Sequence, residues 1–143
     1  MIDKGLVIDR LSRIRENLRS LREMGTLTKN EFIGDSRNYH ATARQLQIGI
    51  EACLDVGHHI ISRKALRRPK DYKDIFIILG EERIIPLSLA ESLVKMAKYR
   101  NRLVHLYWEI SPEEIFDILQ GPVNDLDSYV MHIAEFVEKE PAD

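Results

Sequence analysis

Residues 36–64 read SRNYHATARQLQIGIEACLDVGHHIISRK and contain no proline, the residue that most often breaks a helix. Their apolar side chains recur at steps of three and four residues, which places them along one face of an α-helix. These side chains are Leu46, Ile50, Cys53, Leu54, Ile60 and Ile61. The pattern therefore predicts one long helix from Ser36 to about Lys64.

The segment before this helix has the same periodicity. Residues 6–24 place apolar side chains on one face and arginines on the others. The apolar positions are Val7, Leu11, Ile14, Leu18 and Leu21. Thr28 and Glu31 then have the spacing of a capping box, which marks a helix beginning. The N-terminal part of the chain is thus predicted to pair an amphipathic helix with the long one.

The segment after the long helix is divided by proline and glycine. Pro69 interrupts the pattern, residues 71–79 restart it, and Gly80 is expected to end it. Pro86 suits the first turn of another helix. The core positions of that helix are predicted to be Ala90, Leu93, Val94 and Ala97.

The C-terminal part predicts two more helices. Ser111 and Glu114 repeat the capping-box spacing and begin a short helix that ends near Gly121. Pro122 opens the last helix. The apolar side of the last helix consists of Leu126, Tyr129, Val130, Ile133, Phe136 and Val137.

Only DIFIILG (74–80) and RIIP (83–86) resemble strands, and both are too short for periodicity to decide. We therefore predict an all-α fold, a bundle of about five to six helices with an up-and-down core, forming one domain over residues 1–143.

Composition narrows the class of protein. The chain is 44% hydrophobic and has no run of about 18 uncharged apolar residues, so we expect a soluble, cytoplasmic protein without a membrane segment. The single cysteine, Cys53, excludes an intrachain disulfide. The formal net charge of −2 gives no overall attraction to nucleic acid, so RNA binding requires a local patch.

Three groups of polar residues are candidate sites. Glu51, Asp55 and His58 lie on one side of the long helix, but no matching Glu-x-x-His pair occurs elsewhere, so we predict no metal site there. The basic run of Arg63, Lys64, Arg67, Arg68, Lys70 and Lys73 either meets phosphates or is a solvated loop. Arg37, His40 and Arg44 share a face that is read as solvent-exposed.

The stretch KYRNRLVHLYWEI (98–110) is different, because its polar side chains suit one chemistry. A guanidinium binds phosphate, an imidazole moves protons near neutral pH, and a phenol forms hydrogen bonds or accepts a modification. On a continuous helix Tyr107 lies about 20° from Arg100, whereas His105 lies about 140° away. Either the helix loosens before Ser111 so that His105 swings towards Arg100, or a second copy of the chain completes the pocket across a two-fold axis. An interhelical hydrogen-bond network of the same residues remains the structural alternative.

The spacing Arg100-x4-His105-x-Tyr107, with Asn101 directly after the arginine, resembles the signature of HepT-like toxins in the HEPN superfamily of helical ribonucleases. The segments IGIEACLDVGHHIIS (48–62), 81–108 and ILQGPVNDLDSYVMHIAEFV (118–137) resemble that family in order and spacing. The resemblance covers nearly the whole chain and implies a HEPN-like helical bundle.

The resemblance also implies a function. It suggests a homodimer that cleaves RNA without metal or cofactor, as the toxin of a type VII-like toxin–antitoxin pair. Arg100 and His105 are then the catalytic residues, and Asn101 orients His105. A minimal nucleotidyltransferase antitoxin transfers AMP to Tyr107, which places an anion beside Arg100 and blocks RNA.

Two other functions fit the same residues. The chain is alternatively a non-catalytic HEPN-type subunit that presents a nucleotide or substrate to a nucleotidyltransferase, and the motif then binds phosphate without cutting. It is otherwise a purely structural helical adaptor, in which Arg100 and His105 are buried and paired.

Overall fold

The computed structural model describes residues 1–141, and this part of the chain is helical without a strand. It contains α1 (Lys4–Gly25), α2 (Lys29–Gly34), α3 (Ser36–Arg63), α4 (Tyr72–Glu81), α5 (Leu87–His105), the short 3₁₀ helix η1 (Tyr107–Glu109), α6 (Pro112–Gln120) and α7 (Asn124–Glu138). The predicted all-α class is confirmed, including for the two segments that resembled strands.

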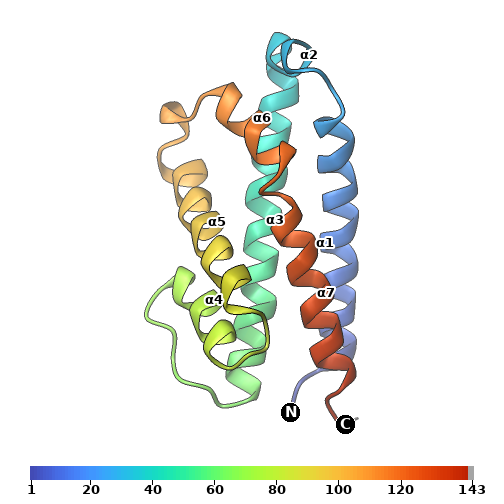
Figure 1. Ribbon diagram of the computed structural model, residues 1–143, viewed down its shortest axis with the longest axis vertical. Helices are drawn as coiled ribbons and strands as arrows, with labels where there is room; N and C mark the ends of the chain where they lie inside the picture. The colour runs from blue at the N-terminus through green and yellow to red at the C-terminus, as the bar shows by residue number, and fades with distance from the viewer. Residues whose placement is uncertain (142–143) are drawn as a thin grey trace.

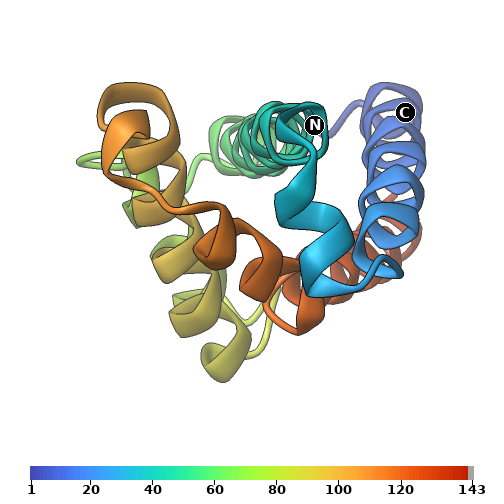
Figure 2. The ribbon, with the colours of Figure 1, turned by 90° about the horizontal axis from the view of Figure 1, so that it is seen from above.

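Helix α3 lies at the centre of the bundle (Figure 1). Helices α1 and α7 pack beside one another on one side of it, and α4 and α5 pack on the other side, as the view from above also shows (Figure 2). In Figure 1, α1 and α5 rise while α3 and α7 descend, which is the up-and-down core that the sequence predicts. This arrangement brings the C-terminal end of α5 next to the N-terminal half of α3.

The predicted apolar faces form the core. All five predicted positions of α1 are at most 3% exposed, and the six predicted positions of α3 are at most 4% exposed. In α7 only Phe136 of the predicted face is half-buried. Burial of these side chains is the main force holding α3 between its neighbours.

Seven α-helices are present among residues 1–141, rather than the predicted five to six, because the capping box of Thr28 begins a helix of its own. Thr28 accepts the N–H of Glu31, and the Glu31 carboxylate accepts the N–H of Thr28. This helix, α2, ends at Gly34 after six residues. Asp35 then caps α3 by accepting the N–H of Arg37. The long helix begins at Ser36, as predicted.

Gly80 does not end α4, contrary to the sequence prediction. The helix continues through Gly80 to Glu81, and the chain turns at Arg83, whose φ is 56°. A Cβ atom added to Gly80 would lie only 2.8 Å from the Cβ of Ala90 in α5. Glycine is therefore needed here for close approach of two helices rather than for a turn.

The second predicted capping box forms only in part. The Ser111 hydroxyl accepts the N–H of Glu114 at 3.2 Å, but the Glu114 carboxylate accepts from Arg102 at 3.0 Å instead of returning to the cap. Helix α7 begins at Asn124, two residues after the proline that was expected to open it. None of the helices in residues 1–141 has both the length and the apolar character needed to span a bilayer.

Candidate active site

Helix α5 ends at His105, inside the motif. Leu106 leaves helical geometry with φ −133° and ψ 34°, and Tyr107 begins the 3₁₀ helix η1. The helix thus loosens before Ser111, but only after His105, so the loosening does not swing His105 towards Arg100 as the first of the two alternatives expects. The wheel that placed Tyr107 about 20° from Arg100 is wrong, because the helix does not extend to Tyr107.

Arg100 is held on three sides near the end of α5. Its Nε lies 3.4 Å from Oε1 of Glu51 in α3, an ion pair that lacks hydrogen-bond geometry. Its Nη1 donates to Oδ1 of Asn101 at 3.1 Å, and its guanidinium lies 5.1 Å from the ring centroid of Tyr72. The side chain is 16% exposed. Nη2 meets no hydrogen-bond acceptor among residues 1–141, so it is available to a ligand.

Glu51 faces Arg100 of the motif and does not come together with Asp55 and His58. Gln47 donates to Oε1 of Glu51 at 2.8 Å, and the same oxygen faces Arg100. Asp55 and His58 are exposed on another part of α3. No three potential metal ligands gather anywhere in residues 1–141.

Tyr107 is close to a histidine that the sequence analysis had placed on a solvent-exposed face. The Tyr107 hydroxyl lies 2.6 Å from Nδ1 of His40 in α3, and the two rings are 5.7 Å apart. Partial burial raises the pKa of the Tyr107 phenol, with a smaller contribution from Tyr39. His40 is exposed, as expected, but its contact with the motif tyrosine was missed.

A stripe on α3 connects the two parts of the motif. His40, Arg44, Gln47 and Glu51 follow one another at steps of four, three and four, the spacing of one helix face. The first contacts Tyr107 and the last contacts Arg100. This α3 stripe was the sequence signal for the missed contact, because a polar row along a core helix needs a polar partner.

A pocket of about 300 Å³ lies over the N-terminal part of this stripe. It is lined by His40, Ala43, Arg44, Gln47, Leu103 and Tyr107. The pocket combines an exposed arginine, the phenol and the imidazole, which are groups that suit an anionic ligand. Arg100 does not line it.

His105 is exposed and makes no hydrogen bond or ion pair with any of residues 1–141, so the structure does not bring it to Arg100 within one chain. Asn101, which was expected to orient His105, contacts Arg100 instead. Apolar side chains surround His105 at the surface: Val104 is 38%, Leu106 38% and Trp108 78% exposed.

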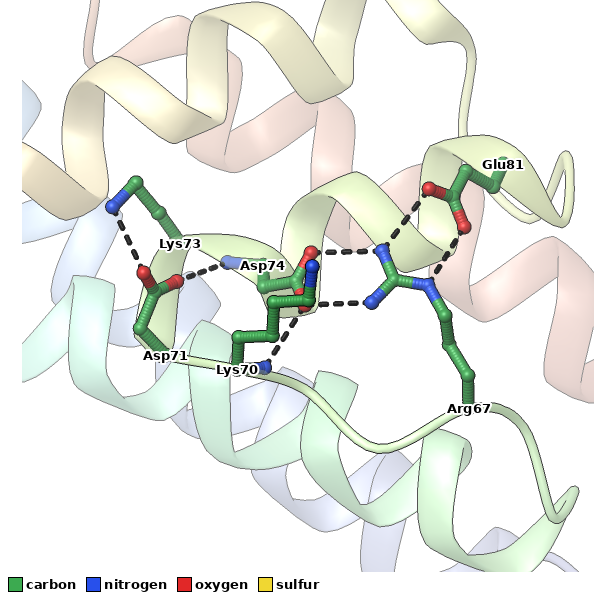
Figure 3. A network of polar contacts seen from close by, with 6 residues as sticks. All are labelled: Arg67, Lys70, Asp71, Lys73, Asp74 and Glu81. Carbon is green, nitrogen blue, oxygen red and sulfur yellow. Dashed lines mark hydrogen bonds and ion pairs between the residues drawn. The ribbon is translucent and has the colours of Figure 1, made fainter.

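Carboxylates pair with half of the six cations in the basic run, and two of these, Arg67 and Lys73, are drawn in Figure 3. Arg67 donates to Asp74 at 2.7 and 2.8 Å and to Glu81 at 3.0 and 3.1 Å. Lys73 pairs with Asp71 at 2.9 Å. Hydrogen bonds from Arg67 lower the pKa of Asp74 to about 2. The solvated-loop reading of this run therefore fits better than the phosphate-binding one.

The fold is an all-α bundle in which an arginine with a free nitrogen and an exposed histidine lie near the end of α5. The chain belongs to the HepT-like ribonuclease family, described as "Ribonuclease HepT-like", whose model matches residues 14–133.

Known proteins of this family are similar over most of their length. The tRNA nuclease HepT of Aphanizomenon flos-aquae is 28% identical over 138 residues, which cover 95% of this chain and 92% of that protein. The mRNA nuclease HepT of Shewanella oneidensis is 26% identical over 129 residues, covering 87% and 93%. The solved structure of a tri-AMPylated Shewanella oneidensis HEPN toxin in complex with MNT antitoxin has a TM-score of 0.82 and 24% identity, covering 94% and 99%.

Proposed function

We propose that this protein is a metal-independent RNA endonuclease of the cytoplasm. It acts as the toxin of a type VII-like pair and is neutralised when a minimal nucleotidyltransferase antitoxin transfers AMP to Tyr107. The observation that carries the proposal is the Arg100 guanidinium of a HepT-like chain, held in place but with Nη2 free for a phosphate. Relatives named as RNA nucleases and an AMPylated structural neighbour support it.

The reaction requires only groups that the motif supplies. The ribose 2′-hydroxyl attacks the adjacent phosphorus, a 2′-O–P bond forms, and the bond to the 5′-oxygen of the next nucleotide breaks. His105 takes the hydroxyl proton or gives one to the leaving oxygen. Arg100 stabilises the charge on the phosphate oxygens through Nη2, while Asn101 supports the guanidinium.

We infer a homodimer, because one chain leaves the site incomplete. His105 and Arg100 do not meet within residues 1–141, and exposed Leu106 and Trp108 flank the histidine. A surface of this kind favours association. Pairing two such surfaces across a two-fold axis lets His105 of one copy approach Arg100 of the other. Light scattering is expected to give twice the 16.6 kDa of one chain.

The test is cleavage of single-stranded RNA in excess EDTA. We expect wild type to cut, His105→Ala to cut about 10²–10⁴-fold more slowly, and Arg100→Ala about 10²–10³-fold more slowly. His58→Ala and Arg68→Ala, at exposed positions away from the motif, are the matched controls. If either motif variant cuts RNA at the wild-type rate, the substituted residue is not catalytic. If wild type binds nucleotide or partner but cuts no RNA, the non-catalytic subunit is the correct reading.

A further inference from the structure

We infer that His40 is the base that takes the proton of Tyr107 when this phenol attacks an electrophilic phosphorus. The inference rests on the proposed modification of Tyr107 and adds a residue from another helix to that step. His40 lies 67 positions before Tyr107 in the sequence and outside the Arg-x4-His-x-Tyr motif. The fold brings the two together because α5 ends at His105 and η1 turns the tyrosine toward α3.

The contact has the geometry of a proton transfer. Nδ1 of His40 lies 2.6 Å from the Tyr107 hydroxyl oxygen, inside the range in which a general base acts. When Nε2 carries the ring proton, Nδ1 accepts the phenolic O–H. Partial burial raises the pKa of Tyr107, so the phenol does not ionise unaided near neutral pH and needs a base to become a nucleophile.

The bonds of the step balance without any further reagent. The Tyr107 oxygen forms a bond to the α-phosphorus of ATP, the bond from that phosphorus to the bridging oxygen breaks, and pyrophosphate leaves with the electron pair. The phenolic proton moves to Nδ1 of His40. Because His40 is exposed, the resulting imidazolium returns a proton to water through Nε2.

The surroundings of His40 and Tyr107 suit an anion on the tyrosine. The ring of Tyr39 packs against His40, with 4.7 Å between the ring centroids in a tilted arrangement. Arg44, one turn further along α3, lines the same pocket as His40 and Tyr107. A phosphate that becomes attached to Tyr107 therefore has the guanidinium of Arg44 in the same pocket.

The first experiment needs no partner protein. An adenosine carrying an arylsulfonyl fluoride reacts with a tyrosine when the phenolic oxygen attacks sulfur and fluoride leaves, so its rate reports how strongly the phenol is activated. We expect Tyr107 to be labelled faster than Tyr72, which is 56% exposed and has no histidine contact in residues 1–141. Peptide mapping by mass spectrometry gives both rates in one sample. Equal rates at the two tyrosines overturn the inference.

Two substitutions separate a base from a residue that only positions the phenol. His40→Asn keeps an oxygen acceptor near the place of Nδ1 but cannot take the proton, and His40→Ala removes both functions. We expect both variants to label Tyr107 about 100-fold more slowly, with Tyr72 unchanged. Added imidazole should restore the rate of His40→Ala. A wild-type rate in His40→Asn, or no rescue of a slow and folded His40→Ala, contradicts the inference. His58→Ala, an exposed histidine of the same helix, is the control.

The second experiment uses the proposed partner, a minimal nucleotidyltransferase, with ATP and magnesium, and follows the mass increase from AMP. We expect the same order of rates as for the sulfonyl fluoride. If wild type is labelled in a His40-dependent way but never receives AMP on Tyr107, the proposed neutralisation fails and activation of the phenol by His40 stands. If wild type receives AMP on Tyr107 and the His40 variants do so equally fast, the inference fails and the proposed neutralisation stands.

Discussion

Arg67 and Arg100 are both paired with carboxylates, but the two pairings leave the guanidinium in different states. Arg67 donates four hydrogen bonds to two carboxylates, so its nitrogens are occupied (Figure 3). Arg100 has one ion pair without hydrogen-bond geometry and one hydrogen bond to an amide oxygen. An arginine is structural when carboxylates occupy all three of its nitrogens, and it is available to phosphate when a nitrogen is left over.

The comparison also explains why charge in the sequence misleads. The run from Arg63 to Lys73 is the densest group of cations, yet two of them, Arg67 and Lys73, are paired with carboxylates of the same part of the chain. Arg100 also stands among other cations, Lys98 and Arg102, but it meets only a single carboxylate, that of Glu51, and the ring of Tyr72. The local balance of donors and acceptors decides which arginine binds a ligand.

The largest expected difference between the two arginines is in catalysis. Arg100→Lys removes the planar fork that binds two phosphate oxygens at once, so we expect RNA cleavage to fall about 100-fold. Arg67→Lys should leave cleavage within twofold of wild type, as expected for a residue outside the site. Single-turnover cleavage at saturating enzyme measures both. Equal losses in the two variants break the comparison.

The contribution of Arg67 to stability should be measurable by replacing its partner Asp74. Asp74 accepts two hydrogen bonds from Arg67 and one from the N–H of Lys70, and it is 6% exposed. We expect Asp74→Ala to lower the free energy of unfolding by about 1.5–3 kcal/mol, with cleavage by the folded protein unchanged. Denaturation in urea measures the stability. Asp55→Ala, at an exposed position, should change it little.

The stabilisation that the Arg67–Asp74 pair contributes should decrease in acid. Hydrogen bonds from Arg67 lower the pKa of Asp74 from its usual 3.8 to about 2 in the folded protein. The pair therefore contributes its full stabilisation above about pH 4 and loses it as the pH falls through about 2. The difference in melting temperature between wild type and Asp74→Asn should be constant above pH 5 and narrow below pH 4. A difference that grows on acidification contradicts the assignment.

The sequence predicts the fold well where helix periodicity carries the information. The buried faces of α1 and α3 match the predicted positions, because burial follows from spacing alone. The sequence mispredicts helix ends that depend on contacts with neighbouring helices. Gly80 looks like a helix end but serves close contact with Ala90, and α5 ends at His105 without a nearby glycine or proline to mark the place.

The candidate site is only partly predictable for the same reason. Spacing and family resemblance single out Arg100 and Tyr107, but not the residues that contact them. Glu51 and His40 come from another helix, and only packing of α3 against α5 brings them to the motif. Their regular spacing on α3 signals in the sequence that a polar partner faces this row, but it does not tell which residues of the chain that partner contains.

The smallest expected effect concerns the charge that partly neutralises Arg100. Glu51→Gln keeps an oxygen near Nε of Arg100 but removes the negative charge, so the guanidinium stays in place and attracts phosphate more strongly. Because both side chains are partly exposed, such a pair is worth about 0.2–1 kcal/mol, which corresponds to RNA binding that is tighter by up to about fivefold. Fluorescence anisotropy with RNA that carries 2′-deoxyribose at the cleaved position measures binding without cutting. The gain should shrink as salt rises, because added ions screen the interaction between Glu51 and Arg100. Weaker binding in Glu51→Gln would mean that the carboxylate mainly holds Arg100 in position, and the two arginines would then be closer in role than their hydrogen bonds suggest.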